Sequence, residues 1–474
     1  MSFFLTNNDI KLLFPLIAVI FFIVIIAVSR LWDEEGRSAV NGLISGIAIL
    51  MSVFFLVSQW DISAIVLGGV FIADNLSRAA DFLILGSCLF AAMITMERSD
   101  DETVASHRGT YVALLVGAAG MMTAANSGNL IVIFVGIELA TLSMMAMSRE
   151  KSVRSSVEMP VFEALFLIGL FMTGGAAKSV NFFNIKFFMM EGGALSKLFY
   201  LGNALILIYL AGVTYRTTVM LERHHGPAQA EWFYITGLRT ASMIAAFRFL
   251  YVALPKASDK YVVLLAVLAG ANVLAGIMMS ILNTKRLTPA LSAISVIHAG
   301  FALFVVAAGG EFGNVSLVVF LYCAMFGGAG AYAVVSMVEN LHGREATMAD
   351  IAGLERKHVL VAALFLFFLL SIGGMPFTAG FTGNVRVALS TMQLGKAAMW
   401  TLIVGLFAAA SAAARVVLYI YAKKPEVETT GHNEGLFAWG IAVICIVAIV
   451  ALGIRPTALE TLMNFAQNCV IYFE

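Results

Sequence analysis

The sequence predicts an all-α polytopic membrane protein with about fourteen transmembrane helices. Hydrophobic residues make up 61% of its 474 residues and charged residues only 12%, whereas about 25% of the residues in a soluble domain are charged. The chain also contains long apolar runs, each close to the ~20 residues that cross a bilayer as a helix. These runs are too long, and alternate too little, to be the ~10-residue strands of a membrane β-barrel.

Charged residues and clusters of glycine, asparagine or proline separate the apolar runs. No loop between them exceeds about twenty residues, which is too short to fold as a separate domain. The composition also excludes a disordered chain, a nucleic-acid binder and a disulfide-stapled secreted module. No small-residue cleavage site follows the first run, which favours a retained helix over a signal peptide. The approximate ranges are 12–29, 39–58, 75–96, 110–126, 130–148, 160–178, 197–220, 232–254, 260–282, 288–308, 313–338, 358–389, 396–421 and 434–454.

Lysine and arginine are distributed unequally between the two sets of loops. With the N-terminus on side one, the loops on side two carry fifteen of these residues and the loops on side one carry nine. Because cytoplasmic loops are enriched in positive charge, side two is predicted to face the cytoplasm. An even number of helices then places both termini on the non-cytoplasmic side.

Two segments interrupt the helical pattern at membrane depth. One is the polar patch 211–218 in the seventh run, which contains Gly212, and the other is SIGGMPFTAGFTGN (371–384) in the twelfth. Backbone groups freed by a break are tolerated in a membrane only where protein or a water-filled cavity satisfies them. Interruptions at matching places in two halves indicate an inverted-repeat transporter, although two unrelated packing kinks are the alternative. In the second segment, the residues assigned to the break are Gly373, Gly374, Pro376 and Gly380.

Glu138 is the most isolated charge at membrane depth. It lies in the run LIVIFVGIELAT (130–141), with no other charge within two turns. A carboxyl in apolar surroundings favours its neutral form unless a cation pairs with it, and intramembrane charges usually face an interior pathway. A proton-carrying role is therefore predicted, with a structural acid as the alternative. Arg216, in the seventh run, is the cation expected to pair with it.

Four further ionisable residues leave two interpretations open. Glu163, near the start of the sixth run, either faces the same interior or sits at the membrane interface, and Arg239 has the same two alternatives. His298, in a serine-rich segment, is either a proton relay or a satisfied core histidine. Arg386, which follows the second interruption, is either an internal charge or an interface anchor.

The sequence contains no recognisable cofactor or metal motif. No nucleotide loop or dinucleotide fingerprint is present. The cysteines have neither CxxC nor metal-ligand spacing, so no zinc, iron–sulfur or haem site is indicated. These cysteines are Cys88, Cys323, Cys445 and Cys469.

Several of these segments resemble the antiporter-like proton-pumping subunits of respiratory complex I and their Mrp-antiporter and membrane-hydrogenase relatives. The resemblance covers roughly residues 74–420. Its best parts are FVGIELAT (134–141), residues 285–300 with SVIHAG at their end, DIAGLER (350–356) and LSIGGMPFTAGFTG (370–383). The order and spacing of these parts make the resemblance specific. Fourteen helices without a long lateral helix resemble the N-type subunit best and the M-type next.

The resemblance implies an internal organisation for the chain. Residues 1–109 would form helices one to three, and residues 110–254 a first five-helix repeat. Residues 255–424 would form a second, inverted repeat, and residues 425–474 helix fourteen and a tail. Helices seven and twelve would both be broken, and charged residues would line the membrane midplane.

The resemblance also implies a set of proton-pathway residues. The family pairs a glutamate in helix five with a lysine in helix seven, and Glu138 and Arg216 fall on these positions. A charge change from a neighbouring subunit would alter this pair, and protons would then move past the histidine towards helix twelve. The candidate pathway residues are Glu138, Arg216, Arg239, His298, Asn384, Arg386 and Lys178.

This sequence departs from the family at three lysine positions. The helix-eight lysine falls on Met243, with Arg239 one turn earlier, and the helix-twelve lysine falls on Asn384, with Arg386 two residues later. The helix-six lysine is missing, and Lys178 is the basic residue nearby. Arginine does not readily release a proton at neutral pH, so either the charges have moved or proton movement is weakened or differently gated.

The function implied is that of a membrane subunit of a proton-translocating NADH:quinone oxidoreductase. Such a subunit moves protons in response to quinone reduction elsewhere in the complex. NADH, FMN, iron–sulfur clusters and quinone would be held by partner subunits, and M-type and small K-type subunits would be its neighbours in a bacterial inner or plasma membrane. An Mrp-type cation/proton antiporter subunit and a non-pumping structural subunit are the alternatives.

Overall fold

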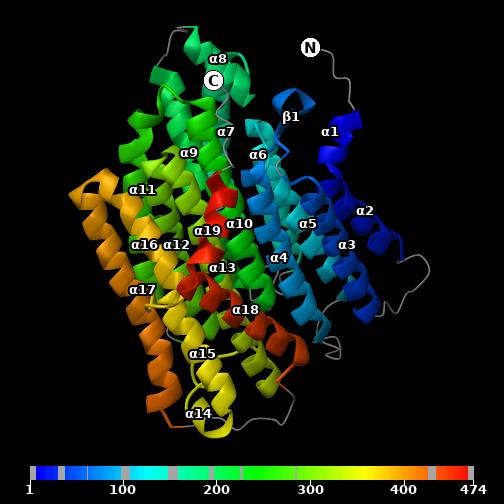
Figure 1. Ribbon diagram of the computed structural model, residues 1–474, viewed down its shortest axis with the longest axis vertical. Helices are drawn as coiled ribbons and strands as arrows, with labels where there is room; N and C mark the ends of the chain where they lie inside the picture. The colour runs from blue at the N-terminus through cyan, green and yellow to red at the C-terminus, as the bar shows by residue number, and fades with distance from the viewer. Residues whose placement is uncertain are drawn as a thin grey trace.

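The protein is a bundle of helices with one small β-hairpin near the N-terminus, seen here in a computed structural model (Figure 1). Almost every element runs roughly along the same axis of the molecule. The structure describes residues 7–29, 38–60, 62–97, 107–147, 159–191, 197–224, 228–282, 285–424 and 434–467.

The N-terminal part combines four α-helices with the β-hairpin. The strands pair antiparallel, with Ile65 opposite Ile72. The backbone N–H of Ile72 also donates to the carbonyl of Asn126, which fixes the hairpin to the end of α5. The elements are α1 (Asn7–Leu12), α2 (Phe14–Ser29), α3 (Ser38–Ser58), β1 (Ala64–Val66), η1 (Leu67–Gly69), β2 (Phe71–Ala73) and α4 (Asn75–Glu97).

A first group of helices follows. Asn129 and Asn181 cap α6 and α8, since each side chain accepts a hydrogen bond from the backbone N–H two residues on; such caps satisfy donors that a helix start leaves open. The group contains α5 (His107–Ala125), α6 (Leu130–Ala146), α7 (Met159–Ala177), α8 (Phe182–Met190), α9 (Lys197–His224), α10 (Ala228–Arg248) and the π-helical turn η3 (Phe249–Ala253).

The second group begins after the π-helical turn. Its helix α11 packs against α12, and α13 packs against α15 and α16. The group contains α11 (Ser258–Leu282), α12 (Leu287–Ala308), α13 (Gly310–His342), α14 (Leu354–Lys357), α15 (Val359–Ile372), α16 (Ala379–Thr391), η4 (Met392–Leu394), α17 (Lys396–Ala422), α18 (Leu436–Ile454) and α19 (Pro456–Gln467).

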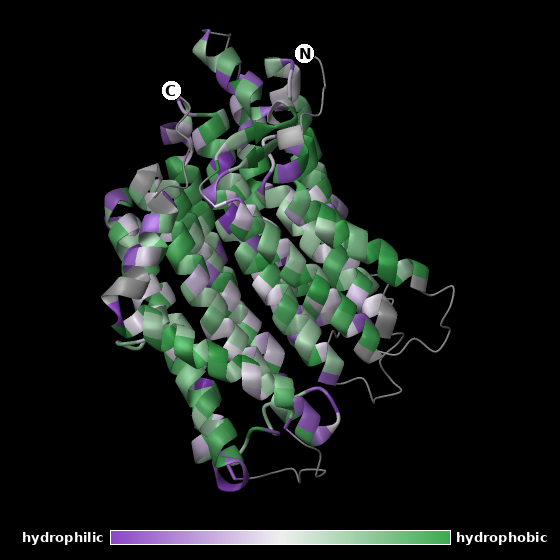
Figure 2. Cartoon of the chain, turned by 45° about the vertical axis from the view of Figure 1, so that its right-hand side comes forward, coloured by the Kyte–Doolittle hydropathy of each residue, from purple (hydrophilic) through white to green (hydrophobic). Residues whose placement is uncertain are grey.

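Helix α10 lies at the centre of the bundle, where it packs against α4, α5, α9, α12 and α13. Every one of its residues is buried. In contrast, α3 and α17 carry exposed side chains such as Phe54 and Phe407, which are 67% and 74% exposed. Polar residues gather at the two ends of the molecule and apolar residues cover its flanks (Figure 2). This pattern is that of a protein surrounded by lipid along its sides.

The helices agree in position with the apolar runs of the sequence. Among the described residues, nine helices are long and apolar enough to cross a membrane, and four shorter helices are also apolar. Each of the fourteen predicted runs contains a described helix, and the twelfth contains both α15 and α16. Residues 373–378 separate these two helices.

The break predicted in the seventh run is wrong. Helix α9 continues without interruption through residues 211–218. The hydroxyls of Thr217 and Thr218 donate to the carbonyls of Val213 and Thr214, so these two polar side chains are satisfied within the helix. Gly212 instead brings α9 close to α7, because a Cβ there would lie 2.8 Å from the ring of Phe162.

Candidate functional site

Glu138 on α6 and Arg216 on α9 form an ion pair in which the Arg216 side chain is 4% exposed and the Glu138 side chain 16%. Nη2 of Arg216 lies 3.1 Å from Oε1 of Glu138 and also donates to the hydroxyl of Thr141 at 3.1 Å. The hydroxyl of Tyr209 donates to the same carboxylate oxygen at 2.6 Å. Oε1 of Glu138 therefore receives two donors, one charged and one neutral.

Helical spacing explains why these groups meet. Glu138 and Thr141 are three residues apart on α6, and Tyr209 and Arg216 are seven residues apart on α9. Both spacings place side chains on one face of a helix. Tyr209 was not among the residues predicted for the site. The signal that could have identified it is its spacing of two helical turns from Arg216.

Aromatic rings enclose this ion pair on one side. The rings of Phe134 and Phe166 stack with centroids 5.1 Å apart, and Phe166 meets Tyr209 edge-on at 4.9 Å. The guanidinium carbon of Arg216 lies 5.4 Å from the centre of the Tyr209 ring, a cation–π distance. Such packing excludes water and strengthens the electrostatic interaction between the charges.

A second carboxylate shares the same arginine. Nη1 of Arg216 lies 3.7 Å from Oε1 of Glu163, within ion-pair range but beyond hydrogen-bond range. The Nε and Nη1 groups of Arg216 are buried and find no hydrogen-bond partner among the described residues. The Glu163 side chain is 27% exposed and lies four residues after the start of α7. One guanidinium faces two carboxylates, an arrangement in which proton binding to one affects the other.

Arg239 lies halfway along α10. Its side chain is buried, and it forms no ion pair with any described residue. Its Nε also finds no hydrogen-bond partner there. The guanidinium lies close enough to act electrostatically on His298 of α12. Met243, one turn later on α10, is fully buried among apolar side chains.

His298 and Asn384 line one small cavity. They are 7% and 9% exposed. The space for the centres of water molecules is about 10 Å³, enough for roughly one water. Nε2 of His298 and the hydroxyl of Ser371 have no hydrogen-bond partner within the described part of the chain. The remaining lining residues are Phe320, Cys323, Ala324, Ile372 and Gly380.

Glycines shape the backbone beside this cavity. Gly374 has φ +81°, a conformation that side-chain-bearing residues rarely adopt, and a Cβ there would lie 2.5 Å from the amide nitrogen of Asn384. A Cβ on Gly380 would overlap the carbonyl oxygen of Ser371. Gly373 and Pro376 lie in the same segment between α15 and α16. The end of α15 thus approaches α16 closely enough to build the cavity.

Two candidate residues lie away from both sites. Lys178 follows the last residue of α7, is exposed and has φ +53°. Arg386 contacts the sulfur of Met463 on α19, and its guanidinium carbon lies 5.5 Å from the ring centre of Phe312. Two residues of helix turn by about 200°, so Arg386 points away from the side of α16 on which Asn384 meets the cavity.

The described residues contain no group of three His, Cys, Asp or Glu side chains suited to a metal ion. Cys88, Cys323 and Cys445 are buried free thiols, and Cys469 lies outside the described residues. The chemistry that these sites offer is the binding and transfer of protons by carboxyl, hydroxyl and imidazole groups.

Comparison with known proteins identifies the family. Residues 127–410 match the transmembrane family of NADH:quinone oxidoreductase and Mrp antiporters. The chain belongs to this family. It is accordingly an integral membrane protein, and the resemblance drawn from residues 134–141, 285–300 and 350–383 is confirmed.

Members of the NADH:quinone oxidoreductase/Mrp family match this chain over most of its length. It is 24% identical to NADH-quinone oxidoreductase subunit N of Alkalilimnicola ehrlichii over 95% of both chains. It is 28% identical to the same subunit of Moorella thermoacetica, over 90% of this chain and 91% of that protein.

Solved structures share the fold. A chain of respiratory complex I from Thermus thermophilus superposes with a TM-score of 0.77 at 21% identity, covering 94% of this chain and 99% of that one. A chain of the Mrp complex from Dietzia superposes with a TM-score of 0.79 at 18% identity, covering 98% and 97%.

Proposed function

We propose that this chain is the N-type membrane subunit of a proton-translocating NADH:quinone oxidoreductase. The observation that carries the proposal is the Glu138–Arg216 pair, in which a carboxylate at membrane depth is held by one cation and one hydroxyl. The curated relatives named subunit N, which match along nearly the whole chain, favour this complex over other members of the family.

The mechanism is electrostatic. A pair of opposite charges at 4 Å interacts with about 4 kcal/mol at an effective dielectric constant of 20, which changes the proton affinity of a carboxyl about a thousandfold. A charge that moves in a neighbouring subunit draws Arg216 towards Glu163 or away from it. Glu138 takes up a proton when the arginine withdraws and releases it when the arginine returns.

The proton path runs from this pair towards the second half of the chain. Arginine keeps its proton in proteins, so Arg216 and Arg239 supply the electric field and do not carry protons. The Tyr209 hydroxyl and water transfer the proton onward, and Arg239 on the central helix sets the charge beside His298. His298 and Asn384 then meet water in the cavity at the break between α15 and α16.

The proposed architecture has two inverted repeats. Residues 110–254 form the first and residues 255–424 the second, with residues 1–109 before them and residues 425–474 after them. Helix α9 is the seventh membrane span, and α15 with α16 the twelfth. Both termini face the non-cytoplasmic side of a bacterial inner or plasma membrane. The M-type and K-type subunits are membrane neighbours, and NADH, FMN, iron–sulfur clusters and quinone bind to other subunits.

Purification through a tag on this chain tests the assignment. We expect flavin and iron–sulfur absorption to co-purify in fixed ratio, together with NADH:quinone reductase activity. A matched preparation from untagged cells is the control. A complex without flavin or iron–sulfur centres that exchanges Na⁺ for H⁺ in vesicles would instead identify an Mrp-type antiporter subunit.

A further inference from the structure

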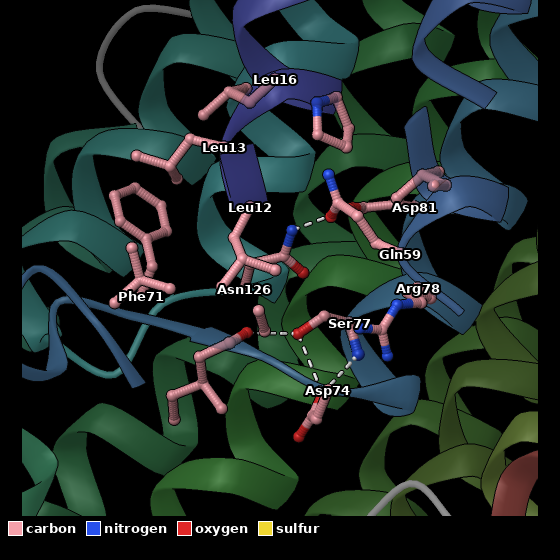
Figure 3. A pocket seen from close by; sticks show the side chains of 15 residues that line it. Leu12, Leu13, Leu16, Gln59, Phe71, Asp74, Ser77, Arg78, Asp81 and Asn126 are labelled. Atoms are coloured by element: carbon pink, nitrogen blue, oxygen red, sulfur yellow. Dashed lines mark hydrogen bonds between the residues drawn. The ribbon is translucent and has the colours of Figure 1, made fainter. Parts of the chain in front are cut away.

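A second, partly open cavity lies at the end of the molecule that carries α1 and the β1–β2 hairpin (Figures 1 and 3). Its space for the centres of water molecules is about 40 Å³, which accommodates roughly three waters. Among the residues lining it, Gln59, Asp74, Ser77, Arg78, Asp81 and Asn126 are polar.

Asp81 is one of two buried carboxyls that line this cavity, the other being Asp74. Asp81 lies on α4, six residues and roughly 9 Å after the helix begins, and is 3% exposed. One oxygen, Oδ2, accepts a hydrogen bond of 2.8 Å from the side-chain amide of Asn126 (Figure 3). The other oxygen, Oδ1, is buried and has no hydrogen-bond partner in the described residues. A buried carboxylate oxygen without a partner is unfavourable, which favours the protonated carboxyl.

The neighbouring charges are already paired with other groups. Nη2 of Arg248 on α10 lies 2.6 Å from Oδ1 of Asp74 and donates to the Ser77 hydroxyl at 2.7 Å. Arg78 donates to the side chain of Asn75 at 2.6 Å and to the carbonyl of Ile62.

Arg248, Arg78 and Asp74 are the charged groups that act electrostatically on Asp81, and none of them forms an ion pair with it in the described structure. The carboxyl of Asp81 is thus left facing the cavity.

We propose that Asp81 is a proton-exchange site that links the protein interior to the aqueous phase at this end of the molecule. The carboxyl group gives its proton to a water molecule in the cavity, which leaves a carboxylate and a hydronium ion, and the reverse step reloads it. Asn126 positions the carboxyl by holding Oδ2. Because α4 packs against α10, the site adjoins the helix that carries Arg239. This inference rests on the proposed function.

Infrared difference spectroscopy of the purified complex during a pH change tests the site directly. We expect the C=O band of a protonated carboxyl that shifts in D₂O, and we expect this band to be lost in Asp81→Asn. Asp259→Asn, the same change at an exposed position on α11, should retain the band. Asn126→Leu keeps Asp81 but removes its amide donor, so the band should move to higher frequency even if Asp81→Asn does not assemble.

The number of protons translocated per electron is the second measurement. We expect fewer protons per electron in Asp81→Asn than in Asp259→Asn, with electron transfer retained. No band assignable to Asp81, a band that responds to Na⁺ at constant pH, or undiminished translocation in Asp81→Asn would overturn the inference. Glu138→Gln, measured in parallel, separates the two proposals. If only Glu138→Gln lowers translocation, the proposed function stands and the Asp81 site fails.

Discussion

The two interior sites differ in how they hold polar groups inside a membrane protein. In the first, Glu138 and Arg216 form an ion pair between α6 and α9, and α9 is continuous. In the second, the imidazole of His298 and the uncharged amide of Asn384 lie beside a cavity. The helix there is interrupted between α15 and α16. In the proposed repeats, α6 corresponds to α12, and α9 corresponds to α15 with α16. The comparison shows that an ion pair between two helices can form without an interruption of either helix.

This difference gives the two sites different tasks. A buried ion pair stores electrostatic energy and responds to a distant charge, because the low dielectric of its surroundings leaves the field unscreened. A neutral site next to water passes protons, because imidazole and water both donate and accept. Helix α10, which carries Arg239, packs against both α9 and α12. Four predictions test this contrast, and they are ordered by the size of the expected effect.

Removal of the cation should have the largest effect. In Arg216→Leu, Glu138 and Glu163 lose their shared partner, and breaking a buried pair from one side costs about 3–5 kcal/mol. We expect a clearly lower melting temperature of the purified complex, or failure to assemble. Arg356→Leu, at an arginine whose side chain is 57% exposed, is the control. Equal melting temperatures for the two variants would show that the pair is not structurally important.

Replacement of glycine by alanine should cost more stability at the interrupted helix than at the continuous one. In Gly380→Ala the new methyl group meets the backbone carbonyl of Ser371, which cannot move aside, whereas in Gly212→Ala it meets the ring of Phe162. Overpacking costs about 1–3 kcal/mol, and we expect the larger loss at Gly380. Gly175→Ala, with open space around it, is the control. Thermal unfolding measures all three, and equal losses at Gly380 and Gly212 would contradict the contrast.

Loss of the Tyr209 hydroxyl should weaken the site around Glu138 while the ion pair with Arg216 remains. In Tyr209→Phe the carboxylate loses its neutral donor and keeps Arg216. A hydrogen bond to a charged group contributes about 1.5–3 kcal/mol, and 1.36 kcal/mol corresponds to tenfold in rate. We therefore expect proton translocation to slow by about ten- to a hundredfold, as measured with a pH-sensitive dye in vesicles. Tyr200→Phe removes a hydroxyl from the same helix at an exposed contact with Lys260. A similar rate in both variants would remove Tyr209 from the pathway.

Loss of the ion pair between Asp350 and Arg344, which lies outside the membrane spans, should have the smallest effect. Burial alone raises the pKa of Asp350, but hydrogen bonds from Thr347 and Arg344 outweigh it, and the net pKa is lowered. A carboxyl with a lowered pKa stabilises the folded state above its unfolded pKa of about 3.9, and this contribution is lost as the pH falls through the folded value.

We expect Asp350→Asn to lower the melting temperature modestly at pH 7 and to match the unsubstituted protein in strong acid. Arg344 is 47% exposed, so solvent screening keeps the effect small. A difference that persists unchanged at low pH would refute this explanation.

The sequence was most informative about the positions of the helices and about charges that stand out within one helix. Apolar length located the helices, and the isolation of Glu138 and the position of Arg216 identified their pair. The break in the seventh run was predicted wrongly because threonine hydroxyls bond to the preceding turn as readily as they mark a gap.

Contacts between distant segments were not predictable in this way. Asp74 and Arg248 are 174 positions apart, and Asp81 lies near a helix start, where a carboxylate usually meets water. Lys178 was a candidate to replace the missing helix-six lysine because it is close in sequence. Helix α7, however, ends at the residue before it. Such placements depend on which helices pack together, and no local pattern encodes them.

The most direct test of the central claim is the number of protons translocated per electron in Glu138→Gln. Glutamine keeps the shape of the side chain and removes its proton-binding carboxyl. The control is Glu191→Gln, the same change at an exposed glutamate that ends α8. With normal assembly and NADH oxidation, we predict a lower proton-to-electron ratio in Glu138→Gln than in the control. An unchanged ratio would contradict a role for the Glu138–Arg216 pair in proton translocation.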